Sequence, residues 1–240
     1  MPFSYTEFMT NNYKQKIFTL VLTILMSANI YAYDIEVGGI YYNLDKENKT
    51  AGVAGGDKKY TGDISIPASV KYEGDDYEVK SIDRMAFYWC SDLTSIKIPS
   101  SVTSIGVSAF FRCSGLTSVE IPESVTSLGS TVFGHCSGLL SMDIPSSVTS
   151  IGSLAFGSCS SLKAINVNSG NTAFASVGGV LYDKGITRLV ACPGSLTSID
   201  IPNSVTSIGE WAFSGCSGLT SVDIPNSVTN IEECAFYPCI

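Results

Sequence analysis

The chain has 240 residues, a formal net charge of −8 and only 15% charged residues. This length is enough for one sizeable domain. The acidic balance argues against nucleic-acid binding and against electrostatic binding to anionic lipid, because both require a basic surface.

The N-terminus has the pattern of a secretory signal peptide. Lys14 and Lys16 precede an apolar stretch over residues 17–26, and Ala32 closes a cleavage site. This stretch is too short to span a membrane as a helix. We predict a signal peptide at residues 1–32, with an uncleaved membrane anchor as the alternative, and no membrane span once the signal is removed.

Residues 33–63 lack any repeat and have the composition of strands. Residues 34–44 are rich in β-branched and aromatic side chains, residues 45–49 are typical of a turn, and a weaker strand runs through Val53. A solenoid needs a cap that covers the apolar edge of its first coil. We therefore predict an N-terminal β cap over residues 33–63.

Residues 64–240 carry a repeat that is visible in several residue types. The Ile-Pro pairs at Ile98, Ile121 and Ile144 are spaced by 23 residues, and the pairs at Ile201 and Ile224 keep this spacing. Self-similarity at a period of about 20–50 residues indicates a solenoid, in which each unit buries its apolar face against its neighbours. The repeated aromatic residues are Phe87, Phe110, Phe133, Phe156, Phe213 and Phe236, and the repeated cysteines are Cys90, Cys113, Cys136, Cys159, Cys216 and Cys239.

One unit of the repeat predicts the path of a coil. Residues 116–121 alternate as a short strand does, and Pro122 ends it because proline removes a ladder donor. A second short extended segment covers residues 125–128. Residues 131–136 fit one helical or 3-10 turn, whose spacing directs Phe133 inward.

The cysteines are expected to be structural. The chain has eight, and six of them occupy one position of the repeat. Cysteines in an exported protein normally form disulfides. A stacked row inside the coil instead predicts reduced, buried thiols, because parallel Cβ vectors do not point at each other. The state of Cys192, Cys234 and Cys239 stays open, and Cys234 could pair with Cys239.

The repeat is interrupted between Cys159 and Cys216. An irregular unit at about residues 168–196 contains two short apolar segments, residues 180–182 and 187–190, joined by a turn. We expect these segments to form a β hairpin. The alternative is a loop excursion without a function.

The unit L-x-x-I-x-I-P-x-x-V-x-x-I-G-x-x-A-F-x-x-C, repeated over residues 64–240, resembles the BspA-type leucine-rich repeat. The resemblance implies a right-handed leucine-rich-repeat coil with short parallel strands and one helical or 3-10 turn per repeat. It also implies an exported surface or secreted protein. Several members of this family are linked to adhesion to host matrix proteins, other bacteria or host cells, and most have no known ligand.

The sequence contains few residues that a catalytic mechanism could use. His135 is the single histidine, and its position in the repeat holds Trp89, Arg112, Ser158 and Gly215 in other units, so we expect it on the surface. There is no Cys-x-x-Cys pair, no G-x-S-x-G elbow and no phosphate-binding glycine loop. We predict no enzyme activity, no cofactor and no metal.

Two groups of residues form the candidate binding surface. One polar residue per repeat lies between the two inward residues of the first strand, and these residues would stack as a column along one sheet. The column favours binding of a basic partner or weak binding of a cation. The alternative is a solvent-exposed face whose charges only keep the protein soluble. Exposed aromatic and arginine residues are better anchors, because interface hot spots favour Trp, Tyr and Arg. The polar column is Lys97, Glu120, Asp143, Asn166, Asp200 and Asp223, and the anchors are Trp89, Phe111, Arg112 and Trp211.

We therefore predict an exported, non-enzymatic binding or adhesion protein. It would act as a secreted, cell-surface or periplasmic protein and recognise an extracellular protein or glycan through its solenoid surface. The alternative is a structural module that associates end to end, because the sequence shows no C-terminal cap before Ile240.

Overall fold

The computed structural model describes residues 33–237, so the predicted signal peptide at residues 1–32 and Cys239 lie outside the described residues. All regular structure in this part is β-strand. It has no helix with the length and apolar character to cross a membrane. The strands are β1 (Ile35–Val37), β2 (Ile40–Asp45), β3 (Thr50–Ala54), β4 (Gly62–Ser65), β5 (Ser69–Tyr72), β6 (Asp75–Ile82), β7 (Leu93–Lys97), β8 (Ser104–Ile105), β9 (Ser127–Leu128), β10 (Ser141–Ile144), β11 (Ser150–Ile151), β12 (Ala164–Val167), β13 (Phe174–Val177), β14 (Val180–Asp183), β15 (Arg188–Ala191), β16 (Ser207–Ile208) and β17 (Asn230–Ile231).

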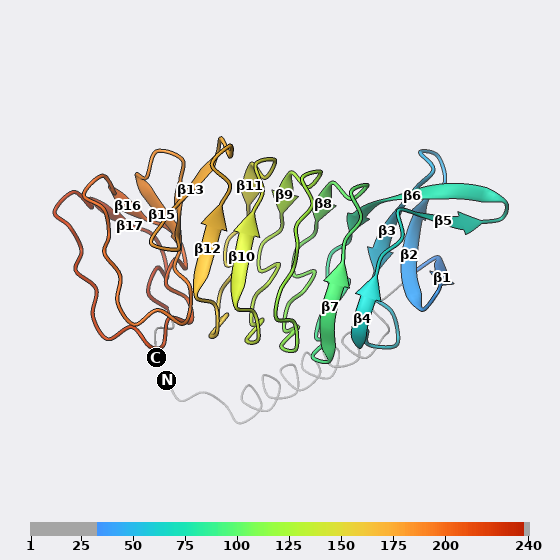
Figure 1. Ribbon diagram of the computed structural model, residues 1–240, viewed down its shortest axis with the longest axis horizontal. Helices are drawn as coiled ribbons and strands as arrows, with labels where there is room; N and C mark the ends of the chain where they lie inside the picture. The colour runs from blue at the N-terminus through green and yellow to red at the C-terminus, as the bar shows by residue number, and fades with distance from the viewer. Residues whose placement is uncertain (1–32, 238–240) are drawn as a thin grey trace, which may run out of the picture. The chain divides into compact units, whose positions relative to one another are not determined.

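Antiparallel strands in the N-terminal segment lead into parallel ladders (Figure 1). β1, β2 and β3 pair antiparallel, and β3 then pairs parallel with β6, which also carries β5. From β6 a parallel ladder runs through β8, β9 and β11. A second set of parallel pairs consists of β4 with β7 and β10 with β12. Short parallel strands are confirmed for the repeats in general, but the strand predicted at residues 116–121 is not formed, and only the second extended segment of that coil pairs, as β9.

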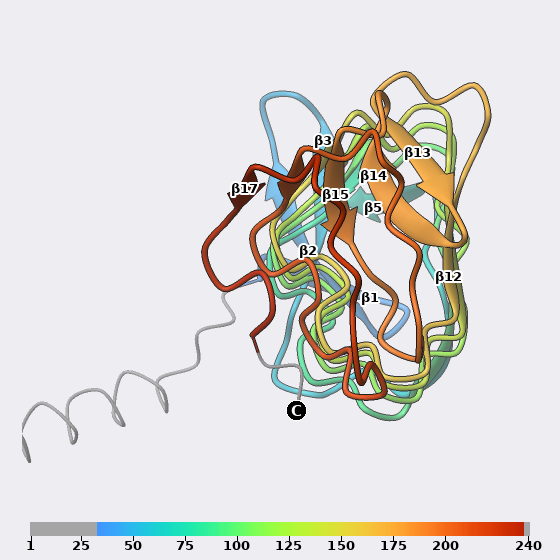
Figure 2. The ribbon, with the colours of Figure 1, turned by 90° about the vertical axis from the view of Figure 1, so that its left-hand side faces the viewer.

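Each regular coil places one segment on each of two sides. β10 ends directly before Pro145, which cannot donate to a ladder, and β11 begins a few residues later. In Figure 2 the coils of residues 83–167 lie one behind another, so equivalent residues of successive repeats form rows. We call a position within the repeat a slot. Residues that occupy the same slot in successive coils form one row.

The helical or 3-10 turn predicted for each repeat is wrong. We call the segment from the Ile-Gly glycine to the repeat cysteine an arc. In the arc of residues 106–113, the backbone of Ser108 and Arg112 is left-handed, with φ of 54° and 61°. Every second N–H, those of Ser108, Phe110 and Arg112, donates to the next coil, and the N–H groups between them donate three residues back. A helix would keep all these bonds within the segment. Left-handed φ recurs at Met85, Trp89, Thr131, His135, Leu154, Ser158, Trp211 and Cys234.

The glycine of the Ile-Gly pair lets neighbouring coils approach closely. A Cβ atom on Gly129 would lie 2.4 Å from the backbone nitrogen of Val107, and one on Gly152 would lie 2.4 Å from that of Ser130. Real Cβ atoms do not come so close to backbone atoms. This glycine is therefore required by the distance between coils.

The core of the regular coils is a column of phenylalanine rings. Phe87, Phe110, Phe133 and Phe156 are almost fully buried, and successive ring centroids lie 5.0, 5.3 and 6.0 Å apart with nearly parallel planes. Stacked aromatic contacts of this kind add to the free energy gained by burying their area. The inward orientation predicted for these rings is correct.

The N-terminal segment extends this column with tyrosines. The Tyr60 ring centroid lies 4.6 Å from that of Phe87, and Tyr41 lies 5.8 Å further on. The buried Tyr60 hydroxyl donates to the carbonyl of Ala54 and accepts the N–H of Tyr41, and burial raises the pKa of Tyr60. The segment predicted as a β cap thus contacts the first coil directly, while its capping role and the right-handed sense of the coil stay predictions.

The cysteines of the regular coils form the predicted buried row. The thiols of Cys113, Cys136 and Cys159 each donate to a phenylalanine carbonyl of the preceding coil at 3.0 Å. Burial raises the pKa of Cys159 to about 12. No disulfide joins the cysteines of residues 33–237, where Cys192 is buried and Cys234 is half-buried, and the pairing of Cys234 with Cys239 lies outside the described residues.

The irregular unit inserts an antiparallel sheet between the repeats. β13 pairs with β14, and β14 pairs with β15, the two segments for which the sequence predicts a hairpin. The buried Asn171 side chain holds the start of this unit, because it donates to the carbonyls of Pro145 and Val148 and accepts the N–H groups of Ala173 and Phe174. β15 then continues in parallel into β16 and β17.

This unit has no arc of its own. The N–H of Ser158 donates to the carbonyl of Ser214 at 3.1 Å, the same lateral bond that joins successive arcs elsewhere. Cys192 occupies the position that the repeat phenylalanine takes in a regular coil. Its N–H donates to the carbonyl of Ala212, as the N–H of Phe87 does to that of Ala109. The core is accordingly divided into one apolar cluster centred on residues 35–167 and a second over residues 180–235.

Candidate functional site

The polar column lies on the side of the coils formed by β7, β10 and β12. Asp143 and Asn166 are register partners on adjacent strands, and the Asn166 amide donates to an Asp143 carboxylate oxygen at 2.8 Å. With Glu120, Glu123 and other polar residues they line a shallow surface depression of about 650 Å³. The exposed side chains are solvated, as expected for charges at a sheet surface.

The irregular unit interrupts this column. Lys97, at the end of β7, pairs in register with Ser65. Asp200 and Asp223 form a separate parallel bridge beyond the β13–β14 hairpin. Within residues 33–237 no group of three or more His, Cys, Asp or Glu side chains is arranged to hold a metal ion.

The anchor residues lie on another surface, along the corner of the arcs. The first slot after the repeat phenylalanine holds Tyr88 and Phe111 in adjacent coils, and their rings stack with centroids 5.2 Å apart. Next in this row come Gly134 and Gly157, then Ser214 and Tyr237. Aromatic residues thus stand at both ends of the row, with small residues between them.

Arg112 occupies the second slot and lies against the neighbouring aromatic residues. Its guanidinium carbon is 4.2 Å from the Trp89 ring centroid and 5.8 Å from that of Phe111. Such cation–π contacts orient a guanidinium without neutralising its charge. Its Nε is buried and has no hydrogen-bond partner, and the side chain forms no ion pair with any described residue.

A mostly apolar hollow of about 280 Å³, here called the arc groove, lies in the row between Phe111 and Tyr237. Its walls are Phe111 with His135 on one side and Trp211 with Tyr237 on the other, and the latter two rings meet edge to face at 5.7 Å. A Cβ on Gly134 would lie 2.9 Å from the Phe111 ring, so this glycine keeps the floor open.

His135 forms part of the groove wall. Its ring meets Phe111 edge to face at a centroid distance of 5.1 Å. Partial desolvation, and then the nearby Arg112 charge, lower the pKa of His135. The predicted surface position of His135 is correct, but its contact with an anchor residue was not anticipated.

A second depression of about 400 Å³, the serine depression, adjoins the arc groove. The two share His135 and Ser158 in their linings. Trp89 and Arg112 line its other side, and a row of hydroxyl groups, one per coil, lines it as well: Ser91, Ser114, Ser137 and Ser160. The two hollows together present aromatic rings, hydroxyl groups and one guanidinium.

Charge is separated between the two surfaces. The depression at the polar column is lined by the carboxylates of Glu120, Glu123 and Asp143. The arc groove and the serine depression are lined by no carboxylate, and Arg112 is their charged residue. In a chain of net charge −8, this favours the arc surface for a neutral or anionic ligand and the column for a basic one.

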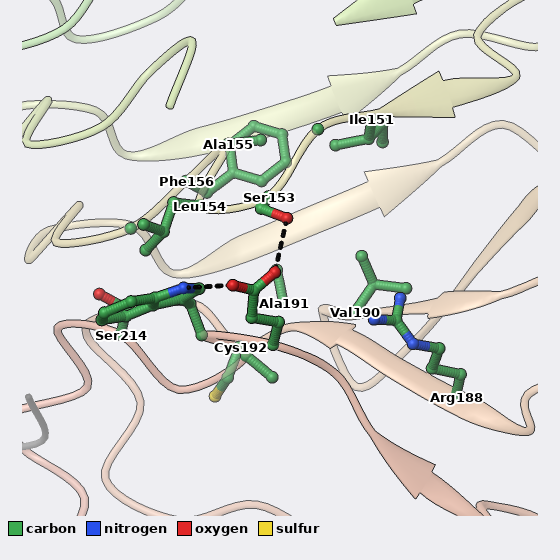
Figure 3. A pocket seen from close by; sticks show the side chains of 15 residues that line it. Ile151, Ser153, Leu154, Ala155, Phe156, Arg188, Val190, Ala191, Cys192 and Ser214 are labelled. Carbon is green, nitrogen blue, oxygen red and sulfur yellow. Dashed lines mark hydrogen bonds between the residues drawn. The ribbon is translucent and has the colours of Figure 1, made fainter. Parts of the chain in front are cut away.

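A small cavity of about 60 Å³ marks the boundary between the two core clusters (Figure 3). The Ser153 hydroxyl donates to Glu210 at 3.1 Å, and the Trp211 indole N–H donates to the same carboxylate at 2.9 Å. Arg188, at its rim, is paired with Glu232. The cavity is too small for a ligand beyond a few water molecules, and we interpret it as imperfect packing where an arc is missing.

Sequence reasoning named the anchors but not their grouping. Trp89, Phe111 and Arg112 are brought together, and Trp211 reaches the same surface from across the irregular unit. Tyr237 and His135 were missed as partners. The signal was present in the first slot after the repeat phenylalanine, where aromatic residues flank two glycines and a serine.

A family model supports the resemblance that the repeats suggest. The model described as "BspA type Leucine rich repeat region" matches in six copies, over residues 77–177 and 190–240. A comparison with curated protein sequences found no match.

Several solved structures are similar. The pneumococcal vaccine antigen PcpA matches with a TM-score of 0.61 and 20% identity over 86% of this chain and 68% of its own. A leucine-rich repeat protein from Eubacterium ventriosum matches with 0.60 and 25% over 88% and 63%, and one from Bacteroides ovatus with 0.55 and 27% over 83% and 55%. The chain thus spans less than two thirds of the length of the last two proteins.

Proposed function

The chain belongs to the BspA-type leucine-rich-repeat family, and we propose that it is an exported, non-enzymatic protein that binds a protein or glycan partner. The binding surface is the arc groove together with the serine depression. Export rests on the signal pattern of residues 1–32, and the similarity to a pneumococcal vaccine antigen, at 20% identity, supports the fold alone.

One observation carries this proposal. Aromatic rings from five arcs, together with an unpaired guanidinium, gather around two adjoining hollows at the surface. Trp, Tyr and Arg dominate the binding free energy of protein interfaces: the two aromatic residues bury large areas with few rotatable bonds, and Arg adds a planar set of charged donors. The solenoid core does not need Phe111 and Arg112 at the corner, since the slots that hold them also hold Gly and Ser in other coils.

The test is binding to an array of glycans and extracellular matrix proteins. We expect the double variant Trp89→Ala/Phe111→Ala to lose at least about tenfold in affinity for whatever the wild type binds, as expected for hot-spot residues. The control is Glu120→Gln/Asp143→Asn, which changes the polar column and should bind as the wild type does. If the column variant loses binding and the arc variant keeps it, the proposed surface is wrong.

A second candidate function is end-to-end association, because the last described coil exposes apolar side chains. Ile224, Ile231 and Tyr237 are 42%, 49% and 63% exposed. Light scattering over a range of concentrations separates the two candidates. A mass that rises with concentration and falls back in the variant Ile231→Lys would favour association, whereas a constant monomer mass would exclude it.

A further inference from the structure

We propose that the ligand of the arc surface is an acidic glycan, a chain of sugars bearing carboxylate groups, and that Arg112 recognises the carboxylate. This inference rests on the proposed function, because it names the ligand of the same surface. It is built from three features of the arcs: an unpaired guanidinium, aromatic walls around an open floor, and a ladder of hydroxyl groups.

Arg112 is suited to bind a carboxylate, and no carboxylate of the described residues forms an ion pair with it. The centroid of the Trp89 ring lies 4.2 Å from the guanidinium carbon, and the buried Nε has no hydrogen-bond partner. Because this Nε is buried, a ligand carboxylate would be bound by the terminal nitrogens of the guanidinium. Arg188 shows the satisfied alternative, since its Nε donates to Glu232 at 2.9 Å.

Arginine suits this task better than a point charge. The planar fork of donors matches the two oxygens of a carboxylate and can bind both at once. Three carboxylates around the two hollows have other partners: Glu210 accepts from Ser153 and Trp211, Glu232 accepts from Arg188, and Asp92 accepts from the Ser91 hydroxyl. A ligand carboxylate is the acceptor that this surface lacks.

The arc groove is shaped for a ring with apolar faces. Its walls are the aromatic rings of Phe111, His135, Trp211 and Tyr237, and its floor is held open by Gly134. The C–H faces of a pyranose ring pack against aromatic rings while the hydroxyl groups at its edge seek hydrogen bonds. The adjoining serine depression supplies such partners.

The hydroxyl ladder matches a repeating ligand. Ser91, Ser114 and Ser137 occupy one slot in successive coils, and the coils are separated by about 5 Å, the spacing of paired strands. One sugar unit of an extended polysaccharide has a similar length. Successive sugar units lying along the stack would therefore meet equivalent hydroxyl groups.

The backbone of the arcs argues against an extended peptide as the ligand. Peptides that add to a β structure need unpaired N–H and C=O groups along an edge. The N–H groups from Ser108 to Cys113 all donate, alternately to the next coil and three residues back. Recognition at this corner must therefore come from side chains, as it does for sugars.

The experiment is a fluorescence titration, because both tryptophans of the chain, Trp89 and Trp211, line the two hollows. Acidic probes are paired with neutral counterparts: oligogalacturonate with its methyl ester, sialyllactose with lactose, and hyaluronan oligomers with neutral chitin oligomers. We expect at least one acidic probe to change the fluorescence and to bind at least about tenfold more tightly than its neutral counterpart, the effect of a charge-assisted hydrogen bond.

The variant Arg112→Gln tests the assigned residue. It should bind the acidic probe about tenfold or more weakly and no longer distinguish it from the neutral one, while Arg112→Lys keeps part of the preference. Phe111→Ala should weaken both probes alike. Glu120→Gln is the control and should change neither, and melting temperatures establish that each variant is folded.

Several outcomes would overturn the inference. They are the absence of any response to the acidic probes, equal binding of acidic and neutral probes, or full binding by a folded Arg112→Gln. If Arg112→Gln does not fold, the comparison of each acid with its neutral counterpart on the wild type decides the question. Protein binding that is lost in Phe111→Ala, without any acidic glycan binding, would retain the proposed function and reject this ligand.

Discussion

The two core clusters are built from the same repeat, yet their rings are not equally buried. In the first cluster, Phe110 and Phe133 are fully buried between rings of the coils on either side. In the second, Phe213 is buried and stacks on Phe236, which is 36% exposed. The same side chain thus contributes differently according to its neighbours, since a repeat unit is stable only through the units on both sides of it.

The largest expected effect comes from removing a ring of each cluster. Phe110→Ala deletes a fully buried ring from the middle of a column and should lower the free energy of unfolding by about 3–5 kcal/mol. Phe236→Ala removes a ring that water already reaches and should cost only about 1 kcal/mol. Urea unfolding followed by circular dichroism measures both. Equal losses at the two sites would show that the clusters do not differ in packing.

The next effect concerns the close approach of the regular coils. Gly129→Ala places a methyl group 2.4 Å from the Val107 nitrogen and should destabilise the protein by about 1–3 kcal/mol, as overpacking does. The matched control is Gly185→Ala in the β14–β15 turn, where the nearest atom is 3.5 Å away. Its effect should stay within about 0.5 kcal/mol. A tolerated Gly129→Ala would mean that the coils can separate without loss of packing.

The smallest effect concerns an ion pair of the second cluster. Arg188 donates to both carboxylate oxygens of Glu232, which also accepts the N–H of Glu210. Because the pair is partly exposed, Glu232→Gln should cost no more than about 1 kcal/mol. Lys80 and Glu78 form an exposed pair near the first cluster, and Glu78→Gln should change the stability by less than this.

The pH dependence of that effect has a defined sign. The hydrogen bond from Arg188 lowers the pKa of Glu232 in the folded state. The stabilisation is therefore complete at pH values above the pKa of glutamate in the unfolded chain and is lost as the pH falls through the lower, folded value. The melting temperatures of the wild type and Glu232→Gln should converge in acid, and a constant difference at all pH values would refute this explanation.

The repeat made the core predictable and left the corners uncertain. The spacing of Phe110, Cys113 and their equivalents predicted a row of buried rings and thiols, because a fixed slot must face the same way in every coil. The same pattern suggested a helical turn over residues 131–136, which is wrong. Side-chain periodicity does not reveal that a neighbouring coil will take every second N–H and impose a left-handed φ at Arg112 and its equivalents.

The grouping of the arc surface was beyond the reach of sequence spacing. Phe111 and Trp211 are far apart in the chain, and the length of the irregular unit does not reveal that it omits an arc. The direct bond from Ser158 to Ser214 brings their surroundings together. Likewise, nothing in the period indicated that Tyr60 would continue the phenylalanine column, since it lies outside the repeats.

The missing arc also has a consequence for how such proteins can diversify. Wherever a hairpin-bearing unit of this kind is inserted, it makes lateral neighbours of two corners that belong to non-consecutive repeats. Shifting that unit by a single repeat would juxtapose a different pair of corners and leave every core-forming slot unchanged. A solenoid of nearly uniform coils can in this way acquire a new recognition surface through rearrangement alone, without new side chains.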